Sequence, residues 1–195
     1  MAGVLGVIKV LHSFKESLAM SHKAEDLPIW GEVYKKAFPD MVGMQSYRAD
    51  GFWQREGVDR GILLKTSKQL YVDEKVRGRN KKTGNIYEDI ALEYLSSKES
   101  KTPGWVCKPL RADYIAYLIA PLGKCYLLPV IQMQSAWERN KVEWIGNSWP
   151  IQAKNFDEKT GRAWTTLSCA VPVNVLFKEI GKDLRISFEP FEVVI

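Results

Sequence analysis

The residues with the clearest chemical potential are Asp59, Asp73 and Lys75, which lie in two short segments that both favour β-strand. Polar residues at positions 66–68 predict a tight turn between the segments. If the chain reverses at this turn, Asp59 lies almost opposite Asp73 and Lys75. Alternation along a strand then places Asp73 and Lys75 on one face and Glu74 on the other. Two carboxylates and an ammonium group that converge in this way suit a hard divalent cation and an attacking water.

The pattern of an acid, any residue and a lysine is common, so its context matters. It occurs three times, beginning at Asp73, Glu99 and Asp157. Glu99 lies in a polar linker and Asp157 in a turn, whereas Asp73 lies on a predicted strand that follows another strand with an acid. Context therefore favours Asp73 and Lys75. The competing interpretation is a surface hairpin with a cross-strand ion pair, which contributes only roughly 0.2–1 kcal/mol.

A helix is predicted to precede this hairpin. Asp26 is a candidate N-cap, Pro28 fits the first turn, and Pro39 ends the helix. Between them, apolar residues recur every three or four positions, which predicts one buried stripe. Glu32 lies towards the edge of that stripe, where it is either a solvated acid or a further carboxylate for the site.

The rest of the chain alternates between strand and helix patterns. The segment 112–120 is almost continuously apolar, which is typical of a central strand buried on both faces. The predicted fold class is therefore α/β, with a central mixed β-sheet flanked by helices. The other predictions are a helix at 13–21, an irregular connection at 41–52 that leads through a strand towards Trp53, strands at 86–96, 124–129 and 165–171, a helix at 130–140, and a helix from Pro172 through Lys178 that Gly181 ends.

Length and composition favour a single domain. The chain has 195 residues and a net charge of +5, which is compatible with a nucleic-acid partner. Three widely spaced cysteines without a CxxC motif indicate a reducing compartment. The apolar amino terminus is too short to span a membrane and lacks a cleavage pattern, so we expect a cytoplasmic protein without membrane contact.

A basic loop follows the hairpin and contains Arg77, Arg79, Lys81 and Lys82. Such a loop is either a solvated turn, as most charge runs are, or a contact for nucleic-acid phosphates beside the acidic residues. The chain is also rich in tryptophan. We expect most of these side chains to pack in the core, with stacking on unpaired bases as the alternative. They include Trp105, Trp137, Trp144, Trp149 and Trp164.

Around the acidic hairpin the sequence resembles the PD-(D/E)xK nuclease superfamily, and in particular its Holliday-junction-resolvase-like branch. The resemblance rests on Gly57-Val58-Asp59, on Val72-Asp73-Glu74-Lys75, and on the preceding helix with Glu32. The segment 89–137, with Leu92-Glu93-Tyr94 and Pro103-Gly104-Trp105, also resembles uncharacterised phage and prophage proteins associated with this superfamily. The resemblance implies a restriction-endonuclease-like core over 27–140. It leaves 1–26 as a peripheral segment and 141–195 as a C-terminal strand-helix extension.

The resemblance also implies a function and a set of roles. The protein would be a DNA endonuclease dependent on Mg²⁺ or Mn²⁺, held by Asp59, Asp73 and the backbone carbonyl of Glu74. Lys75 would orient or help to deprotonate the attacking water, and Glu32 or Glu93 would complete the metal shell. Cutting two strands usually requires two active sites, which suggests a homodimer. The expected setting is the cytoplasm of a bacterial or phage-infected cell.

Two features of the sequence depart from the family pattern. No proline precedes Asp59, and Glu74 stands where the family usually has an apolar residue. A shifted register would make the Glu74 carboxylate a ligand instead. Two alternatives to a nuclease remain open. One is a catalytically inactive nucleic-acid-binding protein of the same fold, which Glu74 favours, and the other is a phage structural or interaction protein.

Overall fold

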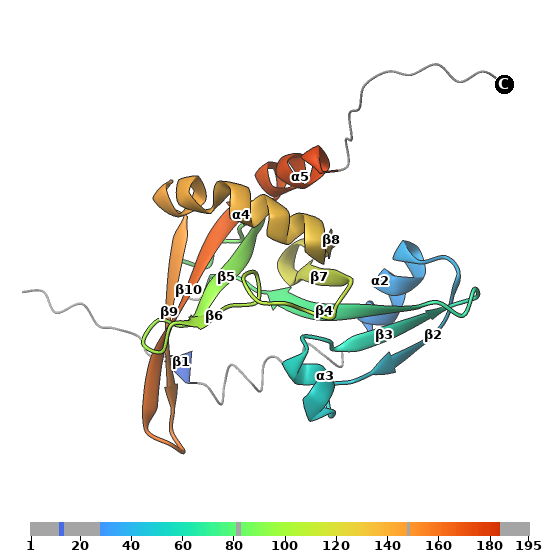
Figure 1. Ribbon diagram of the computed structural model, residues 1–195, viewed down its shortest axis with the longest axis horizontal. Coiled ribbons are helices and arrows are strands. Elements are labelled where there is room, and N and C mark those ends of the chain that lie inside the picture. Colours follow the sequence, from blue (N-terminus) through green and yellow to red (C-terminus); the bar gives the residue numbers. More distant parts are fainter. Residues whose placement is uncertain (1–11, 14–27, 81–82, 148, 184–195) are drawn as a thin grey trace, which may run out of the picture.

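The computed structural model describes residues 12–13, 28–80, 83–147 and 149–183, and has the α/β architecture expected from the sequence. Two mixed β-sheets carry the fold, and helices pack against them (Figure 1). The helices of the described residues are α2 (Ile29–Ala37), α3 (Gly51–Arg55), α4 (Val130–Gly146) and α5 (Val173–Lys182), with a single 3-10 turn, η1 (Ala120–Leu122).

The first sheet contains the predicted hairpin. Its strand order is β2-β3-β4-β7-β8, and all neighbours are antiparallel except β4 and β7. A parallel neighbour requires a long crossover, which here passes through the second sheet. The strands are β2 (Met41–Ser46), β3 (Arg60–Leu64), β4 (Gln69–Arg77), β7 (Tyr114–Ile119) and β8 (Lys124–Pro129).

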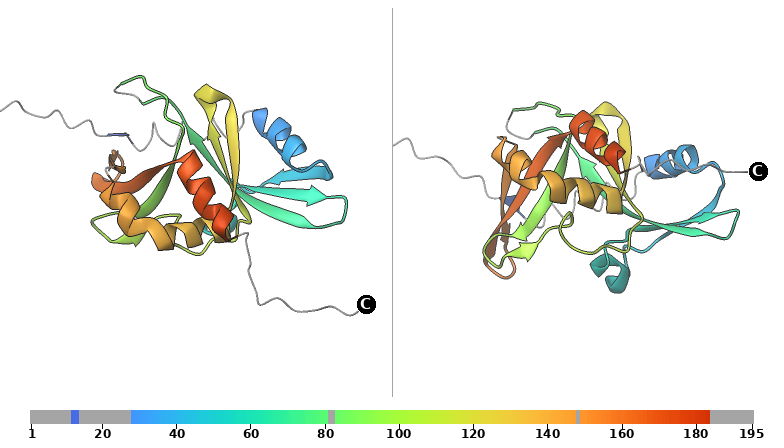
Figure 2. Two further views of the ribbon diagram at one scale, coloured as in Figure 1. Left: turned by 90° about the horizontal axis from the view of Figure 1, so that it is seen from above. Right: turned by 45° about the horizontal axis from the view of Figure 1, so that its top comes forward.

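The second sheet has the order β1-β9-β10-β5-β6, and only β1 and β9 run parallel. Seen from above, the two sheets diverge from one another, with α4 and α5 beside the second sheet and α2 beside the first (Figure 2). The strands are β1 (His12–Ser13), β5 (Asp89–Ser97), β6 (Thr102–Pro103), β9 (Pro150–Asp157) and β10 (Arg162–Pro172).

Strand β7 is buried on both faces, as its apolar run predicts. Ile115 and Ile119 pack into the larger core, whereas Ala116 and Leu118 pack on the opposite face beneath α2. The larger core lies between the first sheet, the second sheet and α4 and α5. It contains Trp105, Trp137 and Trp144, all buried, so the expected core role of these tryptophans is confirmed.

The local predictions are largely confirmed. The hairpin, the helix after Pro28, the strand at 124–129 and the turn before β10 are all present. The helix predicted at 130–140 extends to Gly146, and Gly181 lies inside α5. The strand expected within 41–52 is present as β2, but the segment then ends in a short helix that was not expected, α3, whose N-terminal amides Asp50 caps. The helix predicted at 13–21 and the cap at Asp26 lie outside the described residues, apart from Ser13, which is in β1.

The C-terminal segment shares its core with the rest of the chain. Strands β9 and β10 extend the sheet that contains β5, and Cys169 and Leu176 lie in the same core as Ile115. Strand β5 belongs to this second sheet rather than to the sheet of the hairpin. Among the described residues, no helix combines the length and the apolar character needed to cross a membrane.

Candidate active site

The hairpin register places the predicted acidic residues together. Arg60 pairs with Val72, so Asp59, one residue before, lies opposite Asp73. Asp73 and Lys75 point to the face of β4 that carries the larger core, and Lys75 Nζ donates to Asp73 Oδ1 in an ion pair. The Asp73 side chain is almost fully buried, whereas about a third of the Lys75 side chain is exposed. The ammonium group therefore lies between the buried carboxylate and solvent.

Backbone hydrogen bonds hold Asp59 at the start of β3. Its N–H donates to Val72 O at 2.9 Å, and its carbonyl accepts from Tyr47 N at 2.9 Å. Its side chain accepts from the backbone N–H of Glu74, at 2.8 Å from Asp59 Oδ2. The chain enters β3 through Gly57, whose φ of +71° is in the left-handed region that favours glycine. Hydrogen bonds to β4 and the turn at Gly57 thus fix the position of Asp59.

The electrostatics of Asp73 are those of a crowded acidic site. Burial, together with the neighbouring charge and hydrogen bond of Asp59, raises the pKa of Asp73 to about 7, against the opposing effect of Lys75. For Lys75, burial lowers the pKa, but the charges of Asp73 and Asp59 raise it by more. Two carboxyl groups in contact repel when both are ionised, so a cation beside them is favoured. Lys75 supplies one such charge.

Glu93 of β5 brings a third carboxyl group to this site from the other sheet. Burial raises the pKa of Glu93, and the charges of Lys75 and Lys108 oppose that rise. The charge of Glu93 in turn contributes to the raised pKa of Lys75. Trp105 donates a backbone hydrogen bond to the Glu93 side chain. The structure thus brings together Asp59, Asp73, Lys75 and Glu93, which we call the acidic cluster.

Glu74 lies on the opposite face of β4, beneath α2, with a fully buried side chain. Its carboxylate accepts from Tyr34 Oη at 2.7 Å, Arg48 Nη2 at 2.6 Å and Arg60 Nε at 3.0 Å. The observed register therefore keeps the Glu74 carboxylate away from Asp73, and the shifted-register alternative does not occur. A charged residue is stable at this position because two arginines and a tyrosine satisfy it.

Arg48 links this buried network to the acidic cluster, and the sequence analysis missed it. Its Nη2 atom lies 2.6 Å from Glu74 Oε2 and 3.8 Å from Asp59 Oδ2. Arg48 lies in the connection after β2, where no periodic pattern marks a buried residue. The available signal was Glu74, which stands where the family usually has an apolar residue and which requires a cationic partner when it is buried.

The other predicted site residues lie elsewhere. Glu32 is exposed on α2, on the Glu74 side of the sheet, and lines a separate cavity of about 330 Å³ with Leu118 and Cys125. The structure therefore does not bring Glu32 to the acidic cluster. Lys81 and Lys82 lie outside the described residues. Arg77 and Arg79 both line a larger cavity of about 690 Å³ at the end of β4.

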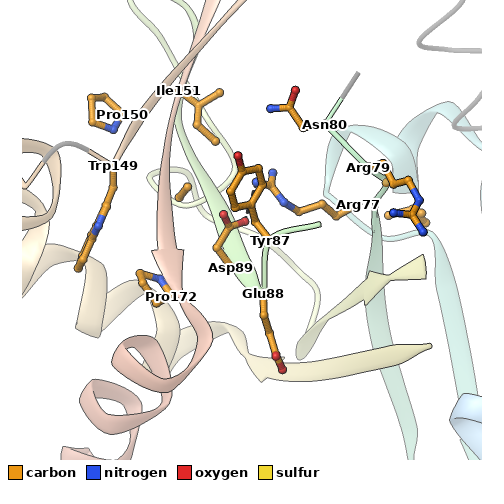
Figure 3. Close-up of a pocket in the computed structure, with 13 residues that line it drawn as sticks. Arg77, Arg79, Asn80, Tyr87, Glu88, Asp89, Trp149, Pro150, Ile151 and Pro172 are labelled. Carbon is orange, nitrogen blue, oxygen red and sulfur yellow. Dashed lines mark ion pairs between the residues drawn. The ribbon is translucent and has the colours of Figure 1, made fainter. Parts of the chain in front are cut away.

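Figure 3 shows that cavity, with Tyr87 and Asp89 near Arg77 in the centre of the view and Trp149 and Pro150 to one side. Arg77 pairs with Asp89 at 2.6 Å. Arg77 follows Lys75 on the same face of β4, and Asp89 precedes Glu93 on the same face of β5. The cavity and the acidic cluster are therefore successive parts of one seam between the two sheets.

The acidic cluster offers two adjacent carboxyl groups that could bind a divalent cation. Mg²⁺ is commonly held by one or two carboxylates and keeps several waters, and Asp59 and Asp73 provide two carboxyl groups in contact. Within the described part of the chain, no group of three histidine, cysteine, aspartate or glutamate side chains is arranged to hold a metal.

No protein-family model matches the chain, and no curated protein or solved structure is significantly similar to it.

Proposed function

We propose that the protein is a metal-dependent nuclease of the PD-(D/E)xK type that hydrolyses DNA phosphodiester bonds. The observation that carries the proposal is the contact between the Asp59 and Asp73 carboxyl groups beside the Lys75 ammonium group, in a seam that remains partly open to solvent. Lys75 supplies one positive charge to two carboxyl groups, so the pair still requires a further cation or a proton, and a structural hairpin has no need of such a pair.

In this proposal Asp59 and Asp73 hold Mg²⁺ or Mn²⁺. The chemistry that such an ion supplies is a lower pKa for a bound water and neutralisation of phosphate charge. Lys75 acts as an ammonium group, because the adjacent carboxylates raise its pKa. It orients the water by donating a hydrogen bond and stabilises negative charge that develops on the phosphate. Glu93 positions Lys75 from the other sheet.

The surroundings of the cluster support a polyanionic substrate. The chain carries a net charge of +5, and Arg77 and Arg79 lie along the seam beyond Lys75. Lysine and arginine side chains that neutralise phosphates make binding strongly salt-dependent. The Asp89 and Glu88 carboxylates near these arginines are themselves paired, with Arg77 and Lys124 respectively, so they repel a phosphate less.

The experiment is a cleavage assay with end-labelled single-stranded, duplex and branched DNA in Mg²⁺, in Mn²⁺ and in EDTA. We expect cleavage only with a divalent cation, and a loss of about 100-fold or more in Asp73→Ala and in Lys75→Ala. Lys159→Ala is the matched control, because Lys159 belongs to the same acid-x-lysine pattern in an exposed turn. Cleavage that persists in Asp73→Ala or Lys75→Ala would refute the proposal.

A nucleic-acid-binding protein without catalysis is the second candidate. It is favoured by the ion pair in which Lys75 already neutralises Asp73. Salt-sensitive DNA binding without heat of Mn²⁺ binding in calorimetry would support this candidate over a nuclease.

A further inference from the structure

The cavity at the end of β4 has the size and lining of a small-ligand site. Its volume of about 690 Å³ lies within the range of such pockets, roughly 300–1,000 Å³. The walls come from the end of β4, from the segment before β5, and from β9 and β10. They combine aromatic rings, small apolar side chains and two arginines. The lining includes Tyr87, Trp149, Ile151, Ala170, Arg77 and Arg79.

The charges around the cavity favour a ligand that has both a ring and a negative group. Arg77 is neutralised by Asp89, whereas Arg79 makes no ion pair with a described residue and donates only a long hydrogen bond to Gly84 O at 3.5 Å. Tyr87 is 42% exposed, so one side of its ring is accessible. Arg79 and Tyr87 line the same cavity, and a cation and an accessible aromatic ring in one cavity suit the phosphate and base of a nucleotide.

The cavity is also placed close to the acidic cluster. Arg77 is two residues beyond Lys75 on the same face of β4, and two residues of a strand span about 6.6 Å. A phosphate at Lys75 would therefore leave its neighbouring nucleotide at the mouth of the cavity. A base within an intact duplex is stacked and paired, so it reaches such a cavity only after it leaves the stack.

We propose that this cavity binds one unpaired nucleotide of DNA, next to the phosphate held at the acidic cluster. The base packs against Tyr87, and Arg79 neutralises a backbone phosphate. The inference rests on the proposed nuclease function and specifies its substrate class: DNA that is single-stranded at the cleavage site, including the unpaired nucleotides at branches and frayed ends. Fully paired duplex would engage the acidic cluster without filling the cavity.

The test is fluorescence anisotropy of the full chain in EDTA, with a labelled single-stranded oligonucleotide and the same sequence as a blunt duplex. We expect tighter binding of the single strand. Tyr87→Ala should weaken single-strand binding about fivefold or more, because stacking of a base on an aromatic ring is lost, and should leave duplex binding unchanged. Tyr87→Phe keeps the ring and should retain wild-type affinity for the single strand.

Phe52→Ala is the matched control. Phe52 is 46% exposed, lies on α3 and is outside the cavity lining, so its removal should change neither affinity. Equal losses in Tyr87→Ala and Phe52→Ala, or an unchanged affinity in Tyr87→Ala, would overturn the assignment of the cavity. Cleavage in Mg²⁺ is measured separately. Tyr87-dependent binding without cleavage would refute the nuclease proposal alone, whereas cleavage unaffected by Tyr87→Ala would refute only the cavity.

Discussion

At the scale of single residues, Glu74 explains how one strand carries chemistry on one face and stability on the other. Its carboxylate is enclosed by Tyr34, Arg48 and Arg60, all within hydrogen-bonding distance. Its backbone N–H donates to Asp59 on the other side of the hairpin. A shift of β4 by one residue would turn both Asp73 and Lys75 beneath α2 and would take Glu74 away from its buried partners, so the Glu74 network maintains the register of the acidic cluster.

We predict that Glu74→Ala lowers the free energy of unfolding by about 3–5 kcal/mol, because Arg48 and Arg60 are left buried without their shared partner. Urea denaturation followed by tryptophan fluorescence measures the change. Lys65→Ala is the control, since Lys65 pairs with Asp40 at 3.6 Å on the surface and such pairs contribute about 1 kcal/mol or less. Similar losses in the two variants would show that Glu74 does not support the hairpin.

At the scale of elements, the position of β5 determines whether Glu93 reaches Lys75. Strand β5 is held on one side by β10 and on the other by the segment around Gly104. Gly104 N donates to Tyr94 O at 3.0 Å, and Val106 N donates to Glu93 O at 3.1 Å. A Cβ atom at position 104 would overlap the backbone carbonyl of Glu93 and lie 2.8 Å from Glu93 Cγ. The two segments approach closely because Gly104 has no side chain.

Gly104→Ala is expected to displace β5 at Glu93 and to lower the free energy of unfolding by about 1–3 kcal/mol, since the clash is with backbone that must move. The midpoint of urea unfolding measures the effect. Gly181→Ala, in a helix with no atom within 4 Å of the added Cβ, should instead raise the free energy of unfolding by roughly 0.5–1 kcal/mol. Equal responses in the two variants would contradict the close approach.

At the scale of the whole molecule, the acidic cluster and the adjacent cavity both lie along the seam between the two sheets. Asp59, Asp73 and Lys75 come from the first sheet, whereas Glu93 and Asp89 come from the second. The second sheet is completed by β9 and β10, and α5 covers the core that both sheets share. The C-terminal segment is therefore a structural partner of the hairpin rather than an appendage to it.

A chain truncated after Asn140 should lose cooperative unfolding. The truncation removes residues 141–146 of α4 together with β9, β10 and α5, and with them the core residues Trp144, Cys169, Val171, Leu176 and Ile180. Strand β5 would then have an unpaired edge and an uncovered apolar face. Thermal unfolding followed by circular dichroism, compared with the full chain, measures this. A sharp transition at a similar temperature would show that residues 27–140 fold independently.

Features that depend on neighbours along the chain could be predicted from the amino-acid sequence. Turn residues at 66–68 and alternation along β4 were enough to place Asp59 opposite Asp73, and to separate Lys75 from Glu74, because hairpin register depends on a short turn and a period of two. The apolar run of β7 was likewise enough to predict burial on both faces.

The residues that complete the site from distant parts of the chain could be identified only in the folded structure. Glu32 and Glu93 were equivalent candidates in the sequence, yet α2 packs on the Glu74 face and β5 lies on the Lys75 face. Arg48 joined Glu74 and Asp59 without any periodic signal. Side-chain periodicity specifies which residues of an element share a face. It does not specify which other element will pack on that face, because that choice depends on the shape and burial of the whole molecule.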